Sequence, residues 1–119
     1  MSSLSYNTAT RSIAVTATAG GASSNVLYTC PTNFDGVVTF LHVSNGAAST
    51  DNVSIQWYHA EENAYFTILN NKSIAGNDVY NMITSDRLYL HAGDKITCFN
   101  GGGSIGVTIA VEEHYNPNR

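Results

Sequence analysis

The chain has 119 residues, of which 43% are hydrophobic and only 12% are charged, and its formal net charge at pH 7 is −4. This length supports one domain with a single core and excludes a second domain. The five basic residues are scattered, which excludes an electropositive surface for nucleic acid, and no apolar run approaches the roughly 18 residues of a membrane span.

The first elements in chain order are an arm and two short strands. Residues 1–11 carry Leu4 and Tyr6 among small polar residues, which predicts an arm that becomes ordered on a partner. Alternating apolar residues predict strands over 12–18 and 25–30. Pro31 ends the second strand because proline cannot donate to a sheet ladder.

The middle of the chain continues in strands. A turn over 32–36 ends in Asp-Gly, and residues 37–44 are apolar on both faces, which predicts a central strand. Residues 53–58 alternate, and Trp57 is predicted at the centre of the core with a hydrogen-bond partner for its indole N–H. Residues 59–63 connect this strand to another over 64–69, which we expect Asn70 and Asn71 to end.

The last third contains the clearest pattern. A short strand is predicted over 79–83, and residues 87–99 predict two strands separated by a turn at Ala92-Gly93-Asp94. In this turn we expect Gly93 to supply an unusual backbone angle and Asp94 to hydrogen-bond within its own turn. Gly101–Gly103 connects these to residues 104–115, where alternate positions are Ile or Val, as in a half-buried strand. Eight or nine strands without a helical period predict an all-β fold: a single antiparallel β-sandwich over 12–115, jelly-roll or immunoglobulin-like, followed by a tail over 116–119.

Residues that could perform catalysis are few. The four histidines are the ordinary acid-base or metal candidates, and alternation places His114 on the same side of its strand as Glu112. No His-x-His or Cys-x-x-Cys spacing accompanies them, and nucleophile and phosphate-binding motifs are absent. We therefore expect no catalytic residue, no metal and no cofactor. Cys30 and Cys98 are expected to be free thiols.

Aromatic side chains are the better candidates for a functional surface. In the adjacent pairs Trp57-Tyr58 and Tyr65-Phe66, one ring must lie on each face of the sheet. The outward rings suit a protein interface, with carbohydrate stacking or plain surface as alternatives. The predicted interface residues are Leu4, Tyr6, Tyr58, Tyr65, Tyr89, His114 and Tyr115.

Four segments together carry a family resemblance: residues 36–45, 53–58, 88–96 and 105–113. With their strand patterns and a Leu-x-Ala-Gly-Asp hairpin before the last strand, they resemble small virion proteins of tailed bacteriophages. The resemblance implies a non-enzymatic structural component of a phage particle. It implies a capsid decoration (cement) protein first and a neck or tail component second, and it transfers no site residues.

These observations define the expected function. We expect a homo-oligomer that binds the major capsid protein or other virion proteins, and neither nucleic acid nor a membrane. The N-terminus has no charged and apolar segments of a signal peptide, so we expect assembly into the virion in the bacterial cytoplasm. A carbohydrate-binding module for host adhesion and a small metal-dependent hydrolase are the competing hypotheses.

Overall fold

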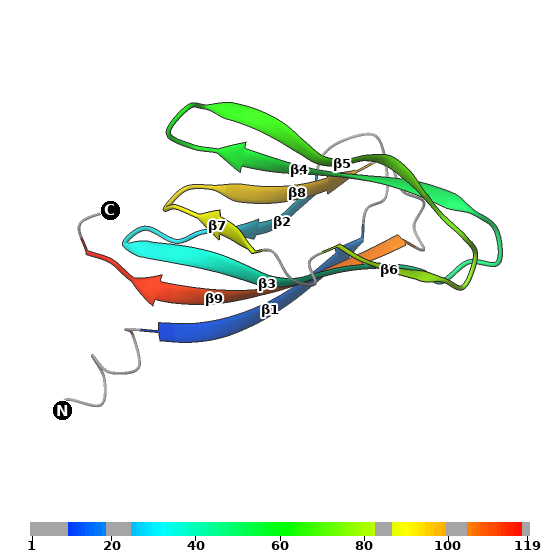
Figure 1. Ribbon diagram of the computed structural model, residues 1–119, viewed down its shortest axis with the longest axis horizontal. Helices are drawn as coiled ribbons and strands as arrows, with labels where there is room; N and C mark the ends of the chain where they lie inside the picture. Colours follow the sequence, from blue (N-terminus) through cyan, green and yellow to red (C-terminus); the bar gives the residue numbers. More distant parts are fainter. Residues whose placement is uncertain (1–9, 19–24, 83–86, 100–104, 118–119) are drawn as a thin grey trace.

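The computed structural model describes residues 10–18, 25–82, 87–99 and 105–117, and these residues form nine β-strands (Figure 1). No helix that is long and apolar enough to cross a membrane occurs among them. The strands are β1 (Thr10–Thr18), β2 (Asn25–Thr29), β3 (Phe34–Asn45), β4 (Asp51–His59), β5 (Ala64–Ile74), β6 (Val79–Asn81), β7 (Leu88–Leu90), β8 (Lys95–Phe99) and β9 (Ile105–Tyr115).

The strands pack as two antiparallel sheets. The five-stranded sheet has the order β1-β9-β3-β6, with β7 also paired to β3, and the four-stranded sheet has the order β2-β8-β4-β5. The pairs are nested in sequence order: β1 pairs with β9, β2 with β8, β3 with β6 and β7, and β4 with β5. One long hairpin wound into two layers gives this order, which is a jelly roll whose sixth strand is split into β6 and β7. The predicted antiparallel sandwich is therefore confirmed.

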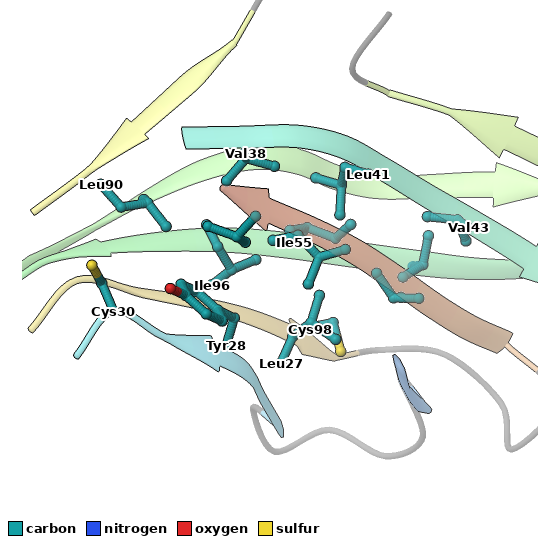
Figure 2. Close-up of a cluster of buried hydrophobic side chains, with 14 of the residues drawn as sticks. Leu27, Tyr28, Cys30, Val38, Leu41, Val43, Ile55, Leu90, Ile96 and Cys98 are labelled. Atoms are coloured by element: carbon teal, nitrogen blue, oxygen red, sulfur yellow. The ribbon is translucent and has the colours of Figure 1, made fainter. Parts of the chain in front are cut away.

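The core lies between the two sheets and follows from the alternation of their strands. The apolar residues of β9 at alternate positions from Ile105 to Val111 are at most 1% exposed. They face side chains such as Ile55 and Ile96 of the four-stranded sheet, several of which Figure 2 shows. Burial of each such side chain stabilises the fold by about 1.5–3 kcal/mol. Alternation in β9 is thus the main determinant of the core.

Trp57 does not lie at the centre of the core, contrary to the prediction. It is only partly buried, and its ring packs against His59 and Phe66 near the end of β4. The indole lies toward the end of the sandwich because Trp57 is near the end of β4, where its N–H donates to Asp94. The centre is filled by aliphatic side chains, among them Leu41 and Ile55. The indole N–H does have a partner, as expected.

The strand β5 is longer than predicted, because the two asparagines bend it without ending it. β5 continues through Asn70 and Asn71 to Ile74. Asn71 has a φ of 50°, in the left-handed region that asparagine adopts more readily than most residues. Its N–H donates to Ser54 Oγ at 2.9 Å, close to the point where the β4–β5 register shifts. Asparagine here produces a bulge.

Three strands begin earlier than predicted, among them β4, which begins at Asp51 and not at Val53. β3 begins at Phe34, so Asp35 and Gly36 belong to the strand and not to the preceding turn. β1 begins at Thr10, so Thr10 and Arg11, which were assigned to the arm, pair with the end of β9. The remainder of the arm with Leu4 and Tyr6, and the connection over 101–103, lie outside the described residues.

The segment with the Ala-Gly-Asp turn is not a hairpin. β7 pairs with β3 in one sheet, whereas β8 pairs with β2 and β4 in the other, so the turn over 91–94 crosses between the sheets. Gly93 has a φ of 88°, which confirms the unusual backbone angle expected of it. A local pattern could predict the turn, but the partners of its two flanking strands are set by the rest of the fold.

Candidate interaction surfaces

A fully buried carboxylate, Glu113, connects β1, β9 and β2. The alternation of β9 places its side chain on the core side, where it is 0% exposed. Arg11 Nε donates to Glu113 Oε1 at 2.5 Å, and the hydroxyl of Tyr28, from the opposite sheet, donates to Oε2. A charge removed from water remains only where it is paired and hydrogen-bonded, and these two donors meet that need. The role of Glu113 is therefore structural.

Three buried side chains stay in their neutral forms: Tyr28 and Cys30 near this ion pair, and Cys98 elsewhere in the core. Burial, with the hydrogen bond to Glu113 as the next cause, raises the pKa of Tyr28 far above its usual value, so Tyr28 remains a donor. Burial and then the charge of Glu113 raise the pKa of Cys30 to about 11. Burial alone raises the pKa of Cys98 to about 11. Both cysteines are buried thiols that form no disulfide, which confirms that prediction, and their raised pKa values make them poor nucleophiles.

A second buried carboxylate, Asp94, joins two turns at the same end of the sandwich. Its Oδ2 accepts from Trp57 Nε1 at 3.3 Å and from the N–H of His91 at 3.1 Å. Its Oδ1 accepts from the N–H of Ala60 at 3.0 Å. Asp94 therefore holds the crossing turn against the β4–β5 turn, and its oxygens are engaged by donors of the protein itself.

The four-stranded sheet carries an aromatic cluster on β4 and β5, made of two cross-strand pairs on opposite faces of the sheet: Tyr58 with Tyr65, and Trp57 with Phe66. The rings of Tyr58 and Tyr65 lie 4.9 Å apart, and those of Trp57 and Phe66 lie 5.5 Å apart. Tyr65 is 53% exposed and Phe66 is 43% exposed. Lys95 Nζ lies 5.5 Å from the centre of the Tyr58 ring. This cluster brings together two of the predicted interface residues.

The other predicted interface residues that the structure describes lie in the five-stranded sheet. Tyr89 on β7 is 64% exposed, and Tyr115 at the end of β9 is 47% exposed with its ring edge against Phe34. His114 is partly exposed, and its Nε2 lies 2.8 Å from Glu112 Oε1. The five predicted residues that the structure describes therefore do not form one surface, and Leu4 and Tyr6 lie outside the described residues.

Sequence reasoning missed one exposed ring, that of Phe40, and one buried carboxylate, that of Glu113. Phe40 is 40% exposed because a bulge in the β3–β9 pairing turns it outward, where it stacks on His42 at 5.5 Å. No signal in the sequence locates that bulge. The burial of Glu113, in contrast, has a signal, because Glu113 continues the odd-numbered alternation of β9 that includes Val111.

The described residues do not offer a metal site. Across residues 10–18, 25–82, 87–99 and 105–117, no group of three or more His, Cys, Asp or Glu side chains is placed to hold a metal ion. The predicted meeting of His114 and Glu112 does occur, but no third ligand joins them. His91 Nδ1 lies 3.4 Å from Asp35 Oδ1, but this contact brings together only one histidine and one carboxylate.

Comparison with known proteins gives only distant structural similarities. No protein-family model and no curated protein matches the sequence. A solved structure of a Bacillus endospore appendage, described as a disulfide-linked pilus, is similar at a TM-score of 0.48 and 11% identity, over 90% of this chain and 86% of that one. An exo-β-1,3-galactanase from Phanerochaete chrysosporium is similar at a TM-score of 0.34 and 17% identity, over 86% of this chain and 29% of that one. Neither similarity bears on function.

Proposed function

We propose that this protein is a non-enzymatic structural subunit of a tailed-bacteriophage particle, and that it docks in many copies on the capsid lattice as a decoration protein. The proposal rests on the resemblance of four strand segments to small virion proteins. It places the protein in the virion after assembly in the bacterial cytoplasm, with the major capsid protein as its partner. A position in the neck or tail is the variant of the same proposal.

The observation that carries the proposal is the contrast between a sealed interior and an exposed aromatic exterior. Both buried carboxylates are engaged by the protein's own donors, so they contribute to stability. Large apolar side chains, in contrast, stand exposed on several strands, where association with a partner would bury them. They are Val26, Phe40, Tyr65, Phe66, Val79, Tyr89 and Tyr115.

The experiment is electron microscopy of purified particles combined with quantitative mass spectrometry. We expect many copies per particle, at positions related by the symmetry of the capsid. Tyr89→Ser and Tyr65→Ser should lower occupancy when recombinant protein is added to capsids that lack it, whereas Thr67→Ser on the same exposed strand should not. Copies confined to the neck or tail would select that variant, and absence from the particle would contradict the proposal.

The aromatic cluster supports one competing function, carbohydrate binding for host adhesion. The exposed ring of Phe66, which packs beside Trp57, gives a sugar a surface on which to stack. A glycan array combined with a titration of Trp57 fluorescence separates the two hypotheses, because Trp57 packs against Phe66. Saturable binding of one sugar class that Phe66→Ala abolishes would favour adhesion, and an unresponsive array would favour the structural subunit.

A further inference from the structure

The four edges of the two sheets differ in how they resist pairing with another chain. An edge strand presents unpaired N–H and C=O groups, and proteins usually shield it with bulges, short length, lysine or proline. β6 and β7 have three residues each. β2 has five residues and a register shift, and β5 has two register shifts and carries Lys72.

Of the described edge strands, only β1 lacks all of these protections. Its nine residues, Thr10–Thr18, pair with β9 in one uninterrupted register. The segment contains no glycine, proline or lysine and is rich in the β-branched residues that favour strands. Its one charge, Arg11, is engaged by Glu113 within the same chain. Figure 1 shows β1 at the margin of the molecule, beyond β9.

The apolar residues of β1 also indicate that the core is incomplete at this edge. Ile13, Val15 and Ala17 point toward the core side, as their partners Val111, Ile109 and Val107 do. The partners are fully buried, whereas the three residues of β1 are only partly buried. A further strand beside β1 would cover them.

We propose that β1 is the self-association edge of this protein, and that β1 of a second copy pairs with it antiparallel about a two-fold axis at Ala14. This partner fits because the strand is complementary to itself. An axis at Ala14 places Ile13 opposite Val15 of the second copy, and Ser12 opposite Thr16, so the same face of each strand is matched. The two five-stranded sheets would then form one continuous sheet.

Size and charge agree with this pairing. Nine residues give a contact about 30 Å long. The two Arg11 side chains would be about 20 Å apart along the strands, which is beyond the screening length at physiological salt. Ala14 itself is small and exposed, so the axis is free of steric obstruction. This inference extends the proposed function by naming the surface through which copies associate.

The first test uses charge at the axis, in the full chain, by sedimentation at several concentrations. The wild type should sediment as a dimer. Ala14→Lys and Ala14→Glu should each raise the dimer dissociation constant at least about tenfold, because like charges would face each other. An equal mixture of the two variants should restore the dimer, and Thr67→Lys on exposed β5 should change nothing. A monomeric wild type, or a dimer that Ala14→Lys leaves intact, would overturn the inference.

The second test fixes the register by disulfide formation under mild oxidation. Ser12→Cys and Thr16→Cys should cross-link when mixed, since these positions are opposite each other. Ser12→Cys alone should not, because its two copies would be about 14 Å apart. The native thiols are buried with raised pKa values and should not interfere. Equal cross-linking of the single variant and the mixture would contradict the register. A dimer that is absent from phage particles would contradict only the proposed function.

Discussion

The two buried carboxylates at one end of the sandwich, Asp94 and Glu113, both hold separate segments of the chain together, but they accept hydrogen bonds from different kinds of donor. Asp94 accepts only neutral donors, two of them backbone N–H groups of the turns that it joins. Glu113 accepts from one cation and one phenol, each on a different strand. Backbone donors cannot be replaced by mutation, whereas Arg11 and Tyr28 can. The Asp94 region is therefore held mainly through backbone N–H groups, whereas the Glu113 region depends on two replaceable side chains from other strands.

The largest effect is expected from Asp94→Ala. The substitution leaves two backbone N–H groups and the indole N–H without their acceptor, and each unsatisfied buried donor costs about 1–3 kcal/mol. We expect the free energy of unfolding, measured by denaturant titration, to fall by about 3–5 kcal/mol. Asp78→Ala is the control, because Asp78 is exposed and its side chain accepts from the N–H of Val79. Equal losses in the two variants would contradict this role.

A smaller loss is expected from Arg11→Met. It leaves the buried Glu113 carboxylate with the Tyr28 hydroxyl, but Arg11 is partly exposed, so water can replace some of the lost interaction. The free energy of unfolding should fall by about 2–3 kcal/mol. Hydrogen exchange should accelerate in β1 before it accelerates in β8, because the ion pair holds β1.

The control for this variant is Lys72→Met, whose exposed ammonium lies 5.0 Å from the centre of the Tyr80 ring. An exposed cation of this kind contributes little, so the loss should stay below about 1 kcal/mol. Uniform acceleration of exchange across both sheets in Arg11→Met would show that β1 is not a separately anchored strand.

The two thiols predict a moderate effect of alkaline pH. Their folded-state pKa values of about 11 exceed the ordinary value of 9.0. Their contribution is therefore complete below pH 9 and is lost as the pH rises through 11. Between pH 8 and pH 10, each thiol should lower the free energy of unfolding by about 1 kcal/mol.

Single substitutions measure the contribution of each thiol to this pH effect. Cys30→Ala removes the thiol beside Glu113, and Cys98→Ala removes the one whose pKa is raised by burial alone. Each variant should show a decline between pH 8 and pH 10 that is smaller by about 1 kcal/mol. A decline that is unchanged in both variants would refute the assignment of the pH effect to the two thiols.

The smallest effect is expected from Tyr65→Ala, outside both carboxylate networks. Tyr65 is exposed, and it contributes its ring contact with Tyr58, so the free energy of unfolding should fall by about 0.5–1 kcal/mol. Thr67→Ala on the same strand is the control. A loss as large as that of Arg11→Met would mean that the aromatic cluster stabilises the fold and is not simply available for contact.

What the sequence predicted well was local. Alternation predicted β9. The Ala-Gly-Asp pattern predicted the positive φ of Gly93 and the hydrogen bond within the turn that Asp94 accepts from the N–H of His91. These features depend on neighbours within a few residues. The prediction that the cysteines are not bridged followed from the expected cytosolic origin, and the indole partner of Trp57 followed from the rule that a buried N–H needs an acceptor.

What the sequence did not predict depends on partners far away in the chain. Arg11 and Glu113 meet because β1 pairs with β9, and Phe40 turns outward because of a bulge against the same strand. Asn71 was assigned to a strand end, since asparagine favours turns, but the pairing with β4 keeps it inside a bulged strand. The candidate surfaces arise from these long-range pairings, so only their individual exposed tyrosines were predicted.

The pairing of β1 with β9 also determines when this protein can finish folding. Thr10 lies opposite His114, so the first described strand gains its place in the sheet only after β9, about 100 residues further along, has been synthesised. Contacts of such high sequence separation slow folding and leave the early strands exposed during translation. A stalled or truncated nascent chain would therefore present β1 and β3 without β9, and we expect such chains to aggregate or to require a chaperone.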